Sequence, residues 1–122
     1  MISEIDPLVM PFDKLIVTTS KREYREVMRD WGAEPAVLSN CFGNTSTVDG
    51  EGCVVWISKK VKGSDLCGLA AHEAVHAAMG LLAMIGENSP ADEELAYMVQ
   101  TITVGILDAC TGAKADSEGS HV

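Results

Sequence analysis

The segment SDLCGLAAHEAVHAAMGLLAMIG, residues 64–86, decides the expected fold because it reads as one long helix with a chemical motif at its centre. Ser64 and Asp65 are typical of a helix start, and Gly86 is typical of a helix end. The residues between them are mostly small and apolar, which predicts a helix buried in the core from Ser64 to about Ile85. The main exceptions are two histidines and one glutamate near the middle of the segment.

These three residues, His72, Glu73 and His76, form the pattern His-Glu-x-x-His. Histidines four residues apart on a helix project from one side, with Cβ atoms about 5–6 Å apart, so both can bind one tetrahedral zinc ion. From its neighbouring position, Glu73 can take a proton from zinc-bound water and deliver it to a leaving amine. The pattern therefore predicts a zinc site with a general base. The alternative is a pair of buried core histidines, which would be costly to desolvate without a metal.

A catalytic zinc ion needs a third protein ligand. His121, the only other histidine, lies in a polar C-terminal stretch with little to hold it in place. Residues 89–92, Ser-Pro-Ala-Asp, are typical of a helix start and predict a second long helix that runs to about Cys110. The acidic residues from position 92 onward, including Glu93 and Glu94, would return against the histidine helix. Periodicity alone does not choose between Glu93 and Glu94.

The remaining sequence predicts a small sheet and one outer helix. Asp13–Thr19 reads as a strand, and Ser20 caps an amphipathic helix over Lys21–Trp31. Ala36–Cys41 and Gly52–Ser58 are apolar, β-branched runs that we expect to pair as a long-looped hairpin. The expected class is therefore α+β: a small mixed or antiparallel sheet packed on two long helices, with a third helix outside.

The length of 122 residues favours one domain, residues 1–122, in which 113–122 form a flexible tail. The formal net charge of −9 argues against nucleic acid and anionic membranes as partners. The first ten residues contain no basic n-region and do not resemble a secretory signal, so we expect a cytoplasmic protein. The longest apolar candidate for a membrane span, Ala96–Leu107, is too short. Four cysteines without a Cys-x-x-Cys pair predict buried free thiols.

The motif, together with Glu93-Glu94-Leu95-Ala96-Tyr97, resembles the gluzincin branch of the zincin metallopeptidases, in which the ligand glutamate heads a Glu-x-x-Ala or similar signature on the following helix. The small size is similar to that of minigluzincins and of small phage-encoded zinc peptidase-like proteins. The match covers Ser64 to about Gln100. It implies a minimal zincin fold with Zn²⁺ as cofactor, with His72, His76 and Glu93 as ligands and Glu73 as the base.

The resemblance also implies a strand for substrate binding, and two residues near the motif have candidate roles because of their helical positions. Val54–Ser58 would be the edge strand along which a peptide substrate aligns. Tyr97 could donate its hydroxyl to the oxyanion of a tetrahedral intermediate, or it could be a core or interface residue. Gly80 could let the glutamate helix approach closely, or it could serve ordinary helix packing.

The function that these features predict is zinc-dependent hydrolysis of peptide bonds, with a peptide or protein as substrate. If the protein is phage-encoded, it would act in the host cytoplasm. The alternative is a non-catalytic zinc-bound module that uses the same scaffold to bind a protein. The sequence does not predict the oligomeric state.

Overall fold

The computed structural model describes residues 2–5, 14–87 and 92–112. These residues form four strands and three helices, which confirms the expected α+β class. In chain order the elements are β1 (Ile2–Ile5), β2 (Lys14–Thr18), α1 (Lys21–Asp30), β3 (Gly43–Val48), β4 (Gly52–Ile57), α2 (Gly63–Met84) and α3 (Asp92–Thr111).

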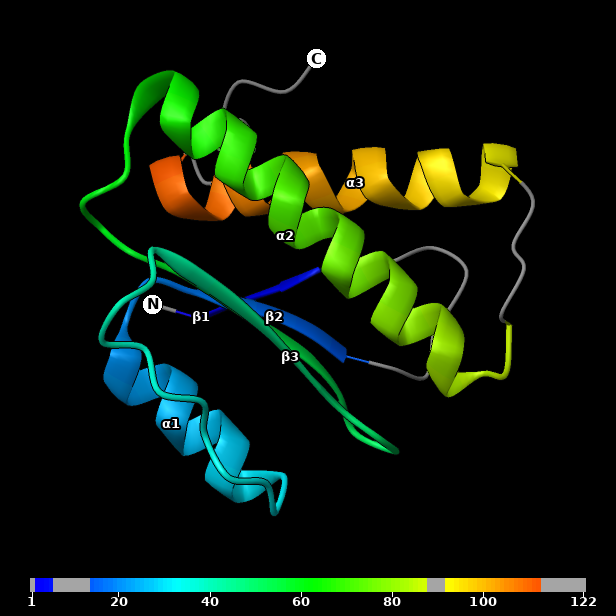
Figure 1. Ribbon diagram of the computed structural model, residues 1–122, viewed down its shortest axis with the longest axis horizontal. Coiled ribbons are helices and arrows are strands. Elements are labelled where there is room, and N and C mark those ends of the chain that lie inside the picture. Colours follow the sequence, from blue (N-terminus) through cyan, green and yellow to red (C-terminus); the bar gives the residue numbers. More distant parts are fainter. Residues whose placement is uncertain (1, 6–13, 88–91, 113–122) are drawn as a thin grey trace.

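The strands form one mixed sheet in the order β1-β2-β4-β3. The central strands β2 and β4 are parallel, and each outer strand is antiparallel to its neighbour. Helix α2 packs over β3 and β4, whereas α3 packs beside α2 over β1 and β2. Helix α1 contacts β2 and β4 and lies across the sheet from α2 and α3 (Figure 1). The molecule therefore has three layers, with the sheet in the middle.

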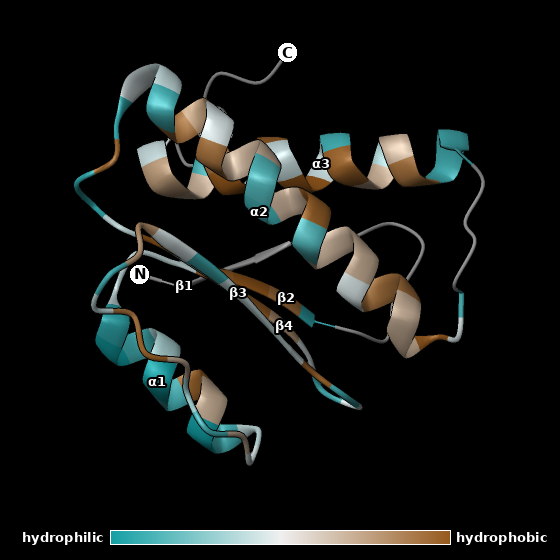
Figure 2. Ribbon diagram, in the orientation of Figure 1, coloured by the Kyte–Doolittle hydropathy of each residue, from teal (hydrophilic) through white to brown (hydrophobic). Residues whose placement is uncertain are grey.

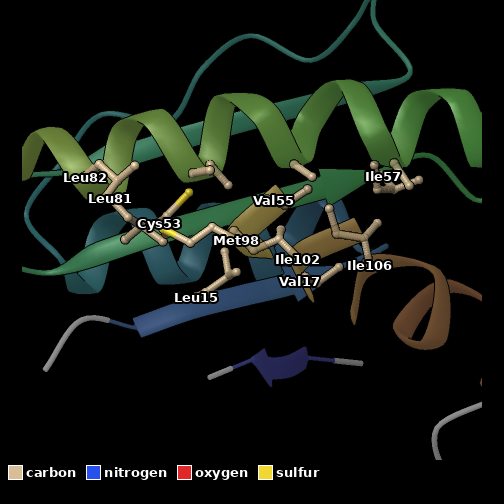
Figure 3. Close-up of a cluster of buried hydrophobic side chains, with 14 of the residues drawn as sticks. Leu15, Val17, Cys53, Val55, Ile57, Leu81, Leu82, Met98, Ile102 and Ile106 are labelled. Carbon is tan, nitrogen blue, oxygen red and sulfur yellow. The ribbon is translucent and has the colours of Figure 1, made fainter. Parts of the chain in front are cut away.

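Alternating residues of the central strands divide the core into two clusters. Leu15, Val17, Cys53, Val55 and Ile57 face α2 and α3, where they meet Leu81, Leu82, Met98, Ile102 and Ile106 (Figure 3). The other side chains of the same strands face α1 and form a smaller cluster that contains Ile16, Tyr24, Val54 and Trp56. This two-sided burial explains the apolar colour of β2 in Figure 2, in contrast to the mostly hydrophilic α1.

Helix α1 agrees with its sequence prediction. The Ser20 hydroxyl accepts a hydrogen bond from the Glu23 backbone N–H at 3.1 Å, which satisfies one of the free donors in the first turn. The helix buries Tyr24, Val27 and Met28, and Gly32 follows it with a φ of 75°. The amphipathic spacing and the two end signals therefore fixed this element.

The predicted hairpin is wrong in its first strand. Residues 36–41 form no strand, and the partner of β4 is the polar segment β3. A short turn joins the two strands, in which the Glu51 N–H donates to the Val48 carbonyl at 3.0 Å. The apolar character of 36–41 was misleading because Leu38 anchors a loop in the α1-facing cluster. β1 was not predicted at all.

The position of β4 is a second correction. Val54–Ser58 was expected to be an edge strand, but β4 lies between β2 and β3 and all its residues are buried. Within the described residues, β3 is the edge strand on that side of the sheet.

Helix α2 spans nearly the predicted range and is followed by Gly86 with a φ of 80°. It is buried on one side only, so the expectation of a fully buried helix is wrong. By length and composition α2 could cross a membrane, whereas the best candidate expected from the sequence was Ala96–Leu107. Core helices of soluble proteins meet the same criterion, and the buried side of α2 packs on the sheet. The predicted helix cap at 89–91 and the tail at 113–122 lie outside the described residues.

Candidate metal centre

The two motif histidines lie side by side on the solvent side of α2. Both are exposed, and their ring centroids are 4.9 Å apart with an angle of 72° between the ring planes. One helical turn separates them, as the sequence spacing requires. The alternative of two buried core histidines is therefore wrong, and the imidazoles are accessible to an ion from solution.

Glu73 occupies a different environment from the histidines. Its side chain is 5% exposed, and the Thr45 hydroxyl of β3 donates to Glu73 Oε1 at 2.6 Å. The same hydroxyl lies 3.3 Å from the Glu73 backbone carbonyl oxygen. A buried carboxylate needs such a donor because its desolvation is otherwise unfavourable. Glu73 is thus held against the edge strand.

Strand β3 crosses α2 closely at two glycines, one on each side of the Thr45 contact. A methyl group on Gly43 would lie 3.3 Å from Glu73 Oε2 and 3.1 Å from a methyl carbon of Leu69. A methyl group on Gly80 would meet the Thr47 side chain. Gly80 does permit a close approach, but the approaching element is β3 and not the expected glutamate helix. The two contacts fix β3 beside the motif.

The structure does not bring Glu93 to the histidines. Within the described residues, no three His, Cys, Asp or Glu side chains form a group that could hold a metal ion. Helical geometry explains the separation: the histidines border the β3 side of α2, whereas α3 packs on the other flank, over β1 and β2. Glu93 is exposed and Glu94 is partly exposed in the first turn of α3. His121 lies outside the described residues.

Tyr97 lies one turn after Glu93 on α3, and its side chain is 61% exposed. A core position for this tyrosine is therefore excluded. The described contacts do not place its hydroxyl at the histidines. Its proposed role at an oxyanion remains a prediction.

Sequence reasoning missed Thr45 and Thr47, the two β3 residues that contact α2 beside the motif. They lie two residues apart in a Gly-Asn-Thr-Ser-Thr-Val run, so their side chains point to the same face of the strand. This alternation of β-branched threonines was the available signal. It was overlooked because the strand was assigned to the more apolar residues 36–41.

No known protein family matches the chain, and neither a curated protein nor a solved structure is similar to it beyond chance. The resemblance to gluzincins therefore rests on the motif and on the residues that follow it. Function must be inferred from the geometry of the chain's own side chains.

Proposed function

We propose that the chain is a zinc-dependent metallopeptidase in which His72 and His76 supply two ligands of the metal. The observation that carries this proposal is the pair of adjacent, exposed imidazoles on α2, with ring centroids 4.9 Å apart. Exposed imidazoles one turn apart suit zinc in ligand type and in spacing. When bound, zinc would polarise a substrate carbonyl and lower the pKa of a bound water molecule.

His72 and His76 provide two of the three protein ligands that a catalytic zinc ion requires. The proposed third ligand is Glu93, or Glu94 beside it, at the first turn of α3. Neither is packed in the core, so ligation would not require a buried side chain to leave its position. It would require the start of α3 to lie nearer to the histidines than it does in this conformation.

Glu73 is the proposed proton acceptor. The Thr45 hydroxyl donates to its Oε1 atom, so the hydrogen bond fixes the orientation of the carboxylate and leaves Oε2 to accept a proton. Because Gly43 has no side chain, the space beside Oε2 stays open, whereas a methyl group at this position would lie 3.3 Å from that oxygen. Residues of β3 would therefore control which molecules reach the base.

The proposed substrate is a peptide in extended conformation. β3 pairs with β4 on one side, and no described strand pairs with its other side. Its free backbone groups could pair with a peptide, which is a mode of recognition that depends little on side chains. β3 takes the place of Val54–Ser58 in this part of the proposal.

The non-catalytic zinc-bound module is the second candidate. One observation favours it. The buried side chain of Glu73 accepts a hydrogen bond from Thr45 of β3, whereas the histidines face solvent. A protein that only binds zinc and a partner needs no base above the metal. Its partner could use the same free edge of β3.

Elemental analysis of protein purified without added zinc tests the metal site first. We expect about one zinc per chain in the wild type and little in His76→Ala. Val75→Ala is the matched control, because Val75 is exposed next to His76 on α2 and carries no ligand atom. Metal-free wild-type protein that stays folded and takes up no zinc would refute the proposal.

Glu73→Gln separates the two candidates once zinc is found. A peptidase should lose cleavage of a peptide library, read by mass spectrometry, while its zinc content stays unchanged. An interaction module should show no cleavage in either protein and should keep its zinc in both. The amide preserves the size of the side chain, so loss of folding is not expected to obscure the result.

A further inference from the structure

A pocket on the opposite side of the sheet from the histidines lies at the carboxyl end of the parallel strands. β2 ends at Thr18 and continues into α1, and β4 ends at Ile57 beside it. The pocket has a volume of about 390 Å³ and is lined by residues of the α1 start, the loop before β3 and the end of β4. In α/β units, ligands commonly bind beyond the carboxyl ends of parallel strands. The volume is in the range of small-molecule sites.

Trp56 lines this pocket and has an unsatisfied donor. Its side chain is 2% exposed, and its Nε1 atom has no hydrogen-bond partner among the described residues. The indole N–H can only donate, and burying it unpaired costs about 1–3 kcal/mol. Native proteins rarely retain such a group without a reason. An acceptor from outside the chain would satisfy it.

Two lysines from different elements line the same pocket. Lys21 starts α1 and holds its Nζ 5.5 Å from the centre of the Trp56 ring, and Lys60 follows β4. The adjoining pocket shares Lys21 and adds Arg25 and Arg29 together with one acidic residue, Glu34. This concentration of positive charge lies in a chain with a formal net charge of −9. Cations gathered at one pocket of an acidic protein favour an anionic ligand there.

Hydroxyl and amide groups complete the lining. Ser39, Asn40 and Ser58 line the pocket together with the apolar side chain of Phe42, which is 62% exposed. Hydroxyls and amides can donate to the same oxyanion as the lysines, and Phe42 can cover an apolar part of a small molecule. The lining therefore matches a small organic anion better than an uncharged apolar compound.

We propose that this pocket binds a small molecule through a carboxylate or phosphate group, with one oxygen accepting from the Trp56 indole N–H and others facing Lys21 and Lys60. The indole nitrogen is buried in this conformation, so an acceptor reaches it only after neighbouring groups move. Lys21 is exposed and lies over the ring, and an anion would draw its ammonium away from the indole face. The site is independent of the proposed zinc centre, which lies across the sheet.

The indole N–H signal of Trp56 is a direct probe of this proposal. The chain has two tryptophans, so a ¹H–¹⁵N spectrum of the full chain shows two indole signals, and Trp31→Phe assigns them. Inorganic phosphate and succinate are titrated separately at constant ionic strength, maintained with sodium chloride. We expect a saturable downfield shift of the Trp56 signal with at least one of them. The better probe identifies whether phosphate or carboxylate is preferred.

Lys60→Ala and Lys59→Ala form a matched pair for the same titration. Both lysines are exposed and each substitution removes one positive charge, but only Lys60 lines the pocket. We expect Lys60→Ala to weaken binding about tenfold or more and Lys59→Ala to change it less than about threefold. The proposal is wrong if neither anion gives a saturable shift, or if both variants weaken the response equally. The zinc content of the protein does not enter either result.

Discussion

The two long sides of α2 differ in a way that the spacing of its motif does not reveal. On one side, Glu73 is buried at β3 and accepts a hydrogen bond from Thr45, and Gly80 allows Thr47 to approach. On the solvent side, His72 and His76 are exposed. The residues of one motif thus belong to two environments: Glu73 is part of the packed structure, whereas the histidines are available for a ligand. Changes on the first side should affect folding, and changes on the second should affect binding.

The largest expected difference is between the thiol labelling rates of two cysteines, buried Cys53 and exposed Cys67. Burial raises the pKa of Cys53, on β4 beneath α2, to about 12 from an ordinary value of 9.0, although a hydrogen bond from Thr47 opposes this effect. Cys67 is exposed on α2. Because the thiolate is the reactive form, a pKa of about 12 in place of 9.0 lowers the labelling rate of Cys53 at neutral pH about a thousandfold, and burial lowers it further.

Mass spectrometry after brief treatment with iodoacetamide at neutral pH measures this contrast. Cys67 should be modified in the folded protein, and Cys53 should be modified only after denaturation. Raising the pH toward 12 should increase modification of Cys53, because its thiol is protonated below that value. Equal labelling of both residues at neutral pH would mean that β4 is not covered by α2. The expectation that all four thiols are buried is already wrong for Cys67.

Thr45→Val is expected to have the next largest effect. The substitution keeps the shape of the side chain but removes the hydroxyl that donates to Glu73 Oε1 at 2.6 Å. Loss of a hydrogen-bond donor to a buried carboxylate lowers the free energy of unfolding by about 1.5–3 kcal/mol. Urea denaturation measures the loss, and Thr45→Ser should recover most of it. If Thr45→Val is as stable as the wild type, Glu73 is not held at β3.

Gly80 and Gly68 offer a matched comparison within α2. A methyl group at Gly80 meets the Thr47 side chain, whereas a methyl group at Gly68 meets nothing within 4 Å. Gly80→Ala should lower the free energy of unfolding by about 1 kcal/mol, because exposed Thr47 can partly turn aside. Gly68→Ala should raise it by about 0.5–1 kcal/mol, since alanine is the better helix former. The same sign in both variants would contradict the close packing of β3 on α2.

Most of the helices and strands were predicted from the sequence, but fewer of the contacts at the candidate metal centre were. Helix α1 and helix α2 were recognised because their ends carry strong signals, Ser20 at one start and Gly86 at one end. β3 was missed because it contains one large apolar residue, Val48, and owes its place to pairing with β4 and to threonine contacts with α2. Such tertiary contacts override local hydrophobicity and leave little trace in a single sequence.

The site shows the same limit in another form. The adjacency of His72 and His76 follows from helical spacing alone, so the sequence predicted it correctly, whereas their exposure was not predicted. The position of Glu93 depends on how α3 crosses the sheet, which no local pattern specifies. The burial of Glu73 depends on the edge strand, which was misplaced. The adjacency of the histidines, which required only one helix, was thus confirmed, whereas the expected approach of Glu93, which required two helices, was not.

Replacing either histidine is expected to have the smallest effect on stability. Both side chains are exposed, so metal-free His72→Ala and His76→Ala should unfold within about 0.5 kcal/mol of the wild type, slightly on the stable side because alanine favours helices. Excess zinc should then raise the melting temperature of the wild type but not of the variants, since a ligand stabilises only the state that binds it. A loss of about 2 kcal/mol without metal would instead assign the histidines a packing role. The solvent side of α2 would then contribute to the packing of the protein and not only to ligand binding.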